Sequence, residues 1–276
     1  MKRTINIILF VILILLLLFL LWLILVPLAD DAEDMPEETI ETMYLRVQSI
    51  EDGYPLVSTN GGGVIKHTGF HLLYNEEHEQ PDWVCYMLTR EQTVTEPADR
   101  SDNFKIDPDV PTKSATPDDY AKTGYDRGHL APAADMSWSE KTMDESFYMS
   151  NISPQKPEFN RGIWKKLENK VRHWASQNDT IYVVTGPLLK QIETTIGENE
   201  VSVPKYFYKV ILDISWNGGY KAIGFIVENT KSTQSVFSYA VSIDYIEQVS
   251  GFDFFPAFQD KAIENLEAKV DTMLWK

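Results

Sequence analysis

The feature that most restricts what this chain can fold into is an uncharged apolar run of twenty residues, from Ile7 to Val26. A helix needs about 20 such residues to cross a hydrocarbon core of about 30 Å. Lys2 and Arg3 precede the run, which exceeds the apolar region of about 7–15 residues found in a cleaved signal peptide. We therefore expect residues 1–28 to be a transmembrane signal anchor, with the rest of the chain outside the cytoplasm, periplasmic or at the cell surface. Cleavage of this segment would instead make the protein secreted.

The apolar run is followed by residues 29–45, which are rich in acidic side chains and predict a tether. Residues 46–276 then remain for one domain, and their length does not force two. The chain has 7 Trp, 13 Tyr and 13 Phe, which are ample for a core. Cys85 is the only cysteine, so no intrachain disulfide partner exists. The sequence does not indicate the oligomeric state.

The pattern of apolar residues in this domain predicts an α+β fold. Alternating, β-branched and aromatic segments predict strands at residues 64–67, 83–89, 147–152, 181–188, 206–214, 220–227 and 236–239. Apolar residues at helical spacing predict helices over 157–177 and 259–274. Residues 91–124 predict a long irregular connection, which in a compact domain is more often functional than idle. We expect a mixed, mainly antiparallel sheet with flanking helices.

The charge distribution is uneven. Nucleic-acid-binding proteins usually carry a basic surface patch, so a net charge of −16 argues against this class of protein. Between Lys156 and Arg172, however, six basic and two acidic residues give a local balance of 6 − 2 = +4. A positive patch on an acidic body can hold phosphate, with weaker and more salt-sensitive binding than a basic protein has.

A run just before this patch, Tyr125 to His129, contains a base and a cation. His129 is the candidate general base, because an imidazole with a pKa of about 6.5 is largely neutral at pH 7 and accepts protons. Arg127 can grip phosphate oxygens in a bidentate manner. Asp126 is predicted to support Arg127 or the backbone. For an isolated histidine the alternative is a structural ring, hydrogen-bonded in a loop.

The start of the predicted helix supplies a metal ligand. Asn160 lies inside the first turn if the helix begins at Pro157, so helix capping does not explain it. An amide oxygen suits Mg²⁺, which takes oxygen ligands and keeps several waters. Glu168 follows eight residues later on roughly the same side and could hold metal-bound water. The alternative is a solvated glutamate paired with Lys165 or Arg172.

Three further side chains complete the predicted site. Asn151 is predicted to fix the tautomer of His129. Arg161 and Lys156 are predicted to contact the substrate beside the metal.

Three runs together resemble a known family: Asp126-Arg127-Gly128-His129, then Ser150-Asn151-Ile152-Ser153-Pro154-Gln155, then Asn160-x-Gly162-x-Trp164-x-x-Leu167-Glu168. They resemble the DNA/RNA non-specific endonuclease family, the sugar-non-specific ββα-metal nucleases, over most of residues 60–275. The resemblance implies a finger of two strands and a helix that holds one Mg²⁺, with Mn²⁺ also possible. It implies His129 as base, Asn160 as metal ligand, Glu168 as a carboxylate behind the metal and Arg127 as a phosphate contact.

One position departs from the family pattern. Some members have an arginine directly before the Asn-Phe pair, where this chain has Asp102, and Arg100 two residues earlier is the substitute candidate for contacting substrate. The resemblance implies endonucleolytic cleavage of DNA and RNA that leaves 5′-phosphates. Two alternatives stay open: an inactive nucleic-acid-binding module, and a metal-dependent hydrolase of another phosphodiester, such as a lipid head group. The sequence does not indicate a preference for DNA or RNA, or for single-stranded or double-stranded substrates.

Overall fold

The computed structural model describes residues 57–178, 180–214, 220–256 and 261–276. The expected anchor at residues 1–28 and tether at 29–45 lie outside this part of the chain, so these boundaries stay predictions. Among the described residues, no helix combines the length and the apolar character that a membrane crossing requires.

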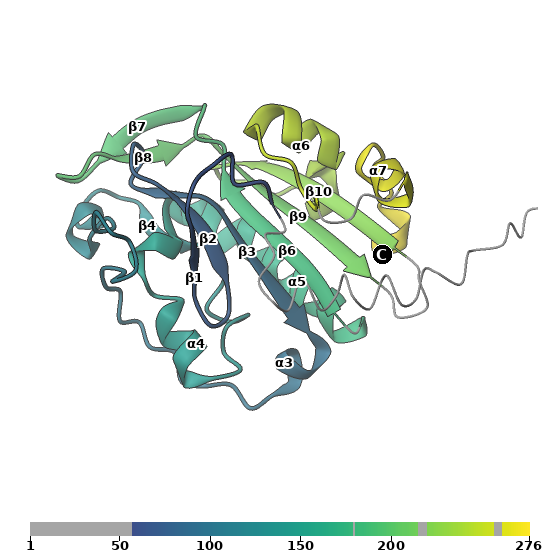
Figure 1. Cartoon of the computed structure of the whole chain (residues 1–276), viewed down its shortest axis with the longest axis horizontal. Helices are drawn as coiled ribbons and strands as arrows, with labels where there is room; N and C mark the ends of the chain where they lie inside the picture. The colour runs from purple at the N-terminus through teal and green to yellow at the C-terminus, as the bar shows by residue number, and fades with distance from the viewer. Residues whose placement is uncertain (1–56, 179, 215–219, 257–260) are drawn as a thin grey trace, which may run out of the picture. The chain divides into compact units, whose positions relative to one another are not determined.

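An antiparallel sheet of seven strands forms the centre of the described domain (Figure 1). Its order is β1-β2-β3-β6-β9-β10-β11, and every neighbouring pair is antiparallel. The strands are β1 (Val64–Lys66), β2 (His71–Asn75), β3 (Gln80–Thr89), β6 (Thr180–Pro187), β9 (Tyr206–Ile214), β10 (Tyr220–Glu228) and β11 (Ala240–Val241). The predicted α+β class with a mainly antiparallel sheet is therefore confirmed.

Helices cover both faces of this sheet. Phe225 of β10 stacks on Trp174 of helix α5 (Lys165–Gln177), with ring centroids 6.3 Å apart. The preceding residue, Gly224, lies under helix α6 (Ile243–Ser250), where a Cβ atom would come within 2.6 Å of Ile246 Cδ1. Because neighbouring residues of a strand point to opposite faces, α5 and α6 cover opposite sides. A Cβ atom there would force the side chain of Ile246 to shift, so this close approach favours glycine.

A second, two-stranded sheet precedes α5 in the chain. Strand β4 (Asp126–His129) pairs antiparallel with β5 (Ile152–Gln155), and Arg127 lies opposite Pro154. The helix predicted over 157–177 follows β5 at once, so the paired strands and a helix occur together as expected, although α4 (Glu140–Glu145) and η2 (Met149–Asn151) separate the two strands in the chain. Its first part is a π-helical turn, η3 (Phe159–Trp164), with a kink at Gly162 (φ −105°, ψ −109°). One continuous α-helix was the expectation, and the structure corrects it. Turns of this kind occur often at functional sites.

The remaining described elements surround these sheets. They are α3 (Arg90–Val94), η1 (Pro117–Tyr120), α4 (Glu140–Glu145), η2 (Met149–Asn151), β7 (Ile192–Ile196), β8 (Val201–Pro204), η4 (Val236–Tyr239), α7 (Lys261–Glu267) and η5 (Met273–Trp275). The strand predicted at 236–239 is wrong, because η4 is a 3-10 helix. The strand predicted at 147–152 is wrong up to Asn151, and the closing helix ends at Glu267 rather than 274.

Candidate active site

The ring of His129 packs against two phenylalanine rings, which also contact each other with centroids 4.9 Å apart. The centroid distances are 5.4 Å to Phe104 and 4.8 Å to Phe147, the latter meeting it edge-on. Nε2 of His129 is shielded from solvent and has no hydrogen-bond partner among the described residues. Burial lowers the pKa of His129 to about 3, and the charges of Arg100 and Arg127 act in the same direction. The imidazole is therefore neutral near pH 7, the protonation state that a general base needs.

Two guanidinium groups flank this aromatic enclosure. The Cζ atom of Arg127 lies 4.3 Å from the ring centroid of Phe104, and that of Arg100 lies 5.0 Å from the centroid of Phe147. Arg100 also donates from Nε to Asp102 Oδ1 at 2.7 Å. The structure thus brings Arg100 beside His129, although Asp102 stands where the family pattern has an arginine. Two such cations are suited to the oxygens of one phosphate.

The side chain of Asn160 is oriented by Asp126. Its Nδ2 donates to Asp126 Oδ2 at 2.9 Å, which leaves the amide oxygen available as a ligand. That oxygen has the donor chemistry that Mg²⁺ prefers, so the residues present fit such an ion. Asp126 and His129 are three residues apart in β4, about 10 Å along the strand. One short strand therefore provides the base and holds the candidate metal ligand.

Arg161 shares the same carboxylate. Its Nε and Nη2 donate to the two oxygens of Asp126 at 2.9 and 2.6 Å, while its side chain stays 73% exposed. The expectation that Asp126 supports Arg127 or the backbone is therefore corrected: its contacts go to Asn160 and Arg161. Contact between Arg161 and a substrate stays a prediction.

Asn151 holds the chain that follows His129. Its side chain accepts from Ala131 N and donates to Ala131 O, both at 2.9 Å, and donates to Ser146 O at 2.9 Å. These contacts fix the backbone after β4. They correct the expectation that the amide of Asn151 bonds to the ring of His129, because its donors and its acceptor are engaged elsewhere.

Glu168 is partly buried beside a group of charged side chains under the helix. Burial raises the pKa of Glu168 above its ordinary value. The charge of Lys209 opposes this increase, and the charge of Asp135 adds to it. Arg172 donates to Asp135 rather than to Glu168, so the alternative of a solvated pair with Arg172 is not what the structure shows. A carboxylate in such surroundings can change protonation near neutral pH, which perturbed groups in active sites commonly do.

Lys209 and Asp135 are the members of this group that sequence reasoning missed. Lys209 is 0% exposed, donates to Thr185 Oγ1 and lies 5.0 Å from the ring centroid of Trp164. Asp135 is 2% exposed and accepts from Tyr86 at 2.7 Å. A signal was present, because Lys209 interrupts the apolar run of β9, where a charge needs a buried partner.

Lys156 has a different partner from the one expected. Its Nζ lies 2.8 Å from Glu193 Oε2 and donates to Oε1 at 3.0 Å. This ion pair joins the start of the helical segment to strand β7. Contact between Lys156 and a substrate stays a prediction.

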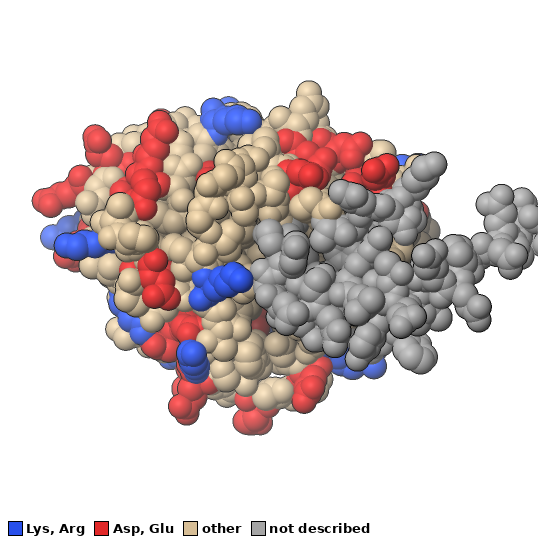
Figure 2. Space-filling view, in the orientation of Figure 1, with Lys and Arg blue, Asp and Glu red and all other residues tan. Residues whose placement is uncertain are grey.

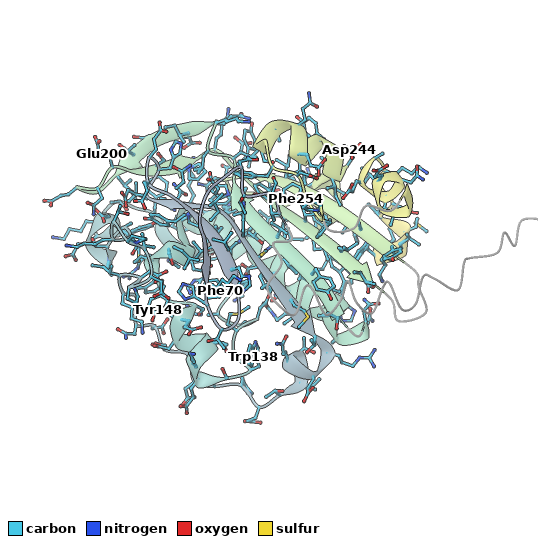
Figure 3. All side chains as sticks on the ribbon, in the orientation of Figure 1. Phe70, Trp138, Tyr148, Glu200, Asp244 and Phe254 are labelled. Carbon is cyan, nitrogen blue, oxygen red and sulfur yellow. The ribbon has the colours of Figure 1, made fainter. Side chains whose placement is uncertain are left out.

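A second polar cluster consists of His67, Asp107 and Asp109. One nitrogen and two carboxylate oxygens of this cluster lie within 4.8 Å of one another, a spacing that a metal ion could bridge. In the structure Nε2 of His67 is 2.8 Å from Asp107 Oδ2, and Nδ1 is 3.8 Å from Asp109 Oδ2. The ring is tilted against Phe70 and Tyr148, which Figure 3 labels.

Several proteins of known sequence are similar to this chain. It is 36% identical over 235 residues to the mitochondrial nuclease EXOG of Xenopus laevis, covering 78% of this chain and 64% of that protein. The chain thus spans less than two thirds of that relative. It is 34% identical over 198 residues to human mitochondrial endonuclease G, covering 67% of each. A nuclease of Nostoc sp. is 32% identical over 216 residues, covering 73% of this chain and 76% of that one.

The fold and the family model agree with these matches. A chain in the crystal structure of the EndoG/EndoGI complex, which concerns EndoG inhibition, superposes with a TM-score of 0.70 at 31% identity. The match covers 78% of this chain and 93% of that chain. The model of the DNA/RNA non-specific endonuclease family matches residues 53–261, which is most of the chain. This chain belongs to the DNA/RNA non-specific endonuclease family.

Proposed function

We propose that the protein is a metal-dependent endonuclease that hydrolyses phosphodiester bonds of DNA and RNA without sequence specificity. The observation that carries the proposal is the neutral ring of His129, flanked by Arg100 and Arg127, on the strand that holds Asn160 through Asp126. These groups meet the three requirements of phosphodiester hydrolysis: a base, cations for phosphate and an oxygen ligand for a metal.

Each group has a role in the proposed reaction. His129 takes the proton of the attacking water, since its imidazole stays neutral. The guanidinium groups of Arg127 and Arg100 hold non-bridging phosphate oxygens and stabilise the added negative charge. Asn160 would hold one divalent cation, Mg²⁺ or Mn²⁺. When bound, that cation supplies positive charge to the phosphoryl group and to the leaving oxygen.

Other residues keep these groups in place. Asp126 orients the amide of Asn160, and Asn151 fixes the backbone after His129. Glu168 is proposed to hold water near the cation, with Lys209 keeping part of its population ionised. Contacts of this supporting kind commonly change metal affinity or activity by about 10–100-fold.

The charge of the molecule does not oppose this proposal. Figure 2 shows acidic side chains scattered over the face in view, with fewer lysine and arginine side chains among them. A nucleic acid would therefore bind through the local cations Arg100, Arg127 and Arg161 against a repulsive background. Such binding weakens steeply with salt.

We also propose that residues 7–26 anchor the nuclease domain to a membrane, with the domain outside the cytoplasm, or secreted if the segment is removed. The support is the length and uniform apolar character of that run. The names of the vertebrate relatives place those proteins in mitochondria. The mitochondrial location belongs to those relatives and is not transferred to this chain.

A cleavage assay tests the proposal. The purified full chain is incubated with supercoiled plasmid and, separately, with single-stranded RNA, in Mg²⁺ and in EDTA. We expect internal cleavage of both polymers in Mg²⁺ and none in EDTA. Binding of both polymers without cleavage in any divalent ion would instead identify an inactive binding module. Hydrolysis of a lipid phosphodiester that competing DNA does not inhibit would identify the third alternative.

A further inference from the structure

A cavity of about 360 Å³ opens beside strand β4, formed by residues between 117 and 127. It includes Pro117 and Tyr120 of η1, then Lys122 and Tyr125 of the following turn. Asp126 and Arg127, the first residues of β4, complete this wall. The cavity has the size of a small-molecule site.

The cavity adjoins the candidate active site, because Asp126 and Arg127 belong to both. Asp126 is the residue that accepts a hydrogen bond from Asn160 at 2.9 Å. Arg127 lies over Phe104, which in turn contacts the ring of His129. A nucleotide next to a phosphate held at Arg127 would therefore lie at the mouth of this cavity.

The lining combines tyrosine rings with charged side chains. Tyr125 is partly exposed and packs on a buried cluster that includes Tyr120, Met149 and Ile152, so its ring has a fixed support. Lys122 is exposed, and Asp118 adds one exposed carboxylate. The charge of Asp126 is balanced by Arg161.

We propose that this cavity binds the base of a nucleotide adjoining the scissile phosphate, with the base stacked on Tyr125 and a neighbouring phosphate at Lys122. This inference rests on the proposed nuclease function and extends it to the substrate. Stacking on an aromatic ring tolerates any base, which agrees with cleavage that ignores sequence. A base inside a duplex cannot reach the ring, so single strands gain this contact and duplexes do not.

The test combines a change in the protein with a change in the substrate. Hexathymidylate is compared with versions in which one thymine is replaced by an abasic analogue, and kcat/KM is measured at each phosphodiester bond. Base stacking is worth about 1–3 kcal/mol, or roughly 5–150-fold. For the wild-type full chain we expect loss of one base to lower cleavage at one neighbouring bond by about tenfold or more.

The variants then separate stacking from structure. Tyr125→Leu keeps the apolar contact with the buried cluster but removes the aromatic face. We expect it to cleave the intact oligonucleotide about tenfold more slowly and to show no further penalty for the abasic substrate. Tyr125→Phe should behave as the wild type. Tyr245→Leu, at a 49% exposed tyrosine of α6, is the matched control and should also behave as the wild type.

The salt dependence of oligonucleotide binding tests the role of Lys122. Lys122→Asn suits the positive φ of 61° at this position, since asparagine tolerates that region better than most residues. For a phosphate contact, the slope of log Kd against log salt for hexathymidylate should fall by about 0.7. An unchanged slope would remove Lys122 from the proposed contact.

The inference is overturned if Tyr125→Leu slows intact and abasic substrates equally, or slows neither. The failure of the proposed function looks different: the wild type would then cleave no polymer in Mg²⁺. In that event, binding of the same oligonucleotides in EDTA, followed by fluorescence anisotropy, still decides the matter. Tighter binding of the intact oligonucleotide that Tyr125→Leu abolishes supports the cavity, and equal binding of both refutes it.

Discussion

Burial and two guanidinium groups determine the charge of His129. They lower its pKa from an ordinary value of about 6.5 to about 3. The sequence predicts only a largely neutral ring, whereas the surrounding side chains make it neutral throughout the physiological range. We expect the Cε1 resonance of His129, in histidine-labelled protein, to stay constant between pH 5 and 8. The same resonance in urea-unfolded protein is the reference, and a midpoint near 6.5 in the folded state would contradict the assignment.

Asp126 offers a second prediction for a single side chain. Asp126→Asn removes the negative charge that orients Asn160 and pairs with Arg161. The Mg²⁺ concentration for half-maximal cleavage should rise by about 10–100-fold. Asp244→Asn, at an exposed carboxylate on α6 that Figure 3 labels, is the control. An Mg²⁺ requirement equal to that of the wild type would show that Asp126 does not support the metal ligand.

At the scale of elements, the pairing of β4 with β5 depends on the absence of a side chain at Gly128. A Cβ atom there would lie 2.1 Å from Cδ of Gln155, which is fully buried. Gly128→Ala should therefore lower the free energy of unfolding by about 1–3 kcal/mol, as overpacking does. Gly63→Ala is the matched control, because a Cβ atom at Gly63 has no neighbour within 4 Å. Equal urea midpoints for the two variants would refute the packing argument.

The elements that periodicity predicted are those with long apolar patterns. The helix over 157–177 has its apolar residues at helical spacing, and its limits are confirmed. The π-helical turn at Phe159–Trp164 could not be predicted, since it arises where Phe159 and Trp164 stack together and on the sheet at Phe207. The hairpin of β7 and β8 was missed because its acidic residues hid the alternation of Ile192, Thr194 and Ile196.

The residues of the candidate active site also fall into those that the sequence could predict and those that it could not. His129, Arg127 and Asn160 belong to short motifs, so their chemistry could be predicted. The contacts of Asp126, and the burial of Lys209 beside Glu168, involve residues distant in sequence. Their partners depend on the fold, which local patterns do not specify. Asp102 replaces the arginine of the family pattern, and local sequence likewise does not show that Arg100 reaches the ring of Phe147.

At the scale of the whole molecule, Asp107 joins distant segments and makes stability depend on pH. Burial raises its pKa, but hydrogen bonds from His67 and Ser150 outweigh this and hold the pKa below its ordinary value of about 4. A lowered folded-state pKa stabilises the fold above about pH 4, and this contribution is lost as pH falls through the folded pKa.

Asp107→Asn should remove that contribution. The urea midpoint of the variant should lie below that of the wild type at pH 6, and the gap should narrow below pH 4. Glu96→Gln, at an exposed carboxylate, is the control and should follow the wild type at every pH. A gap that stays constant down to pH 3 would show that the carboxylate of Asp107 does not respond to protonation as described.

The most direct measurement of the central claim is Mg²⁺-dependent plasmid cleavage by the full chain carrying His129→Ala, beside His173→Ala, an exposed histidine of α5. Equal urea midpoints first establish that both variants fold. Removal of the base should lower the cleavage rate by about 10²–10⁴-fold, and the control should keep the wild-type rate. A rate close to that of the wild type in His129→Ala would contradict the account.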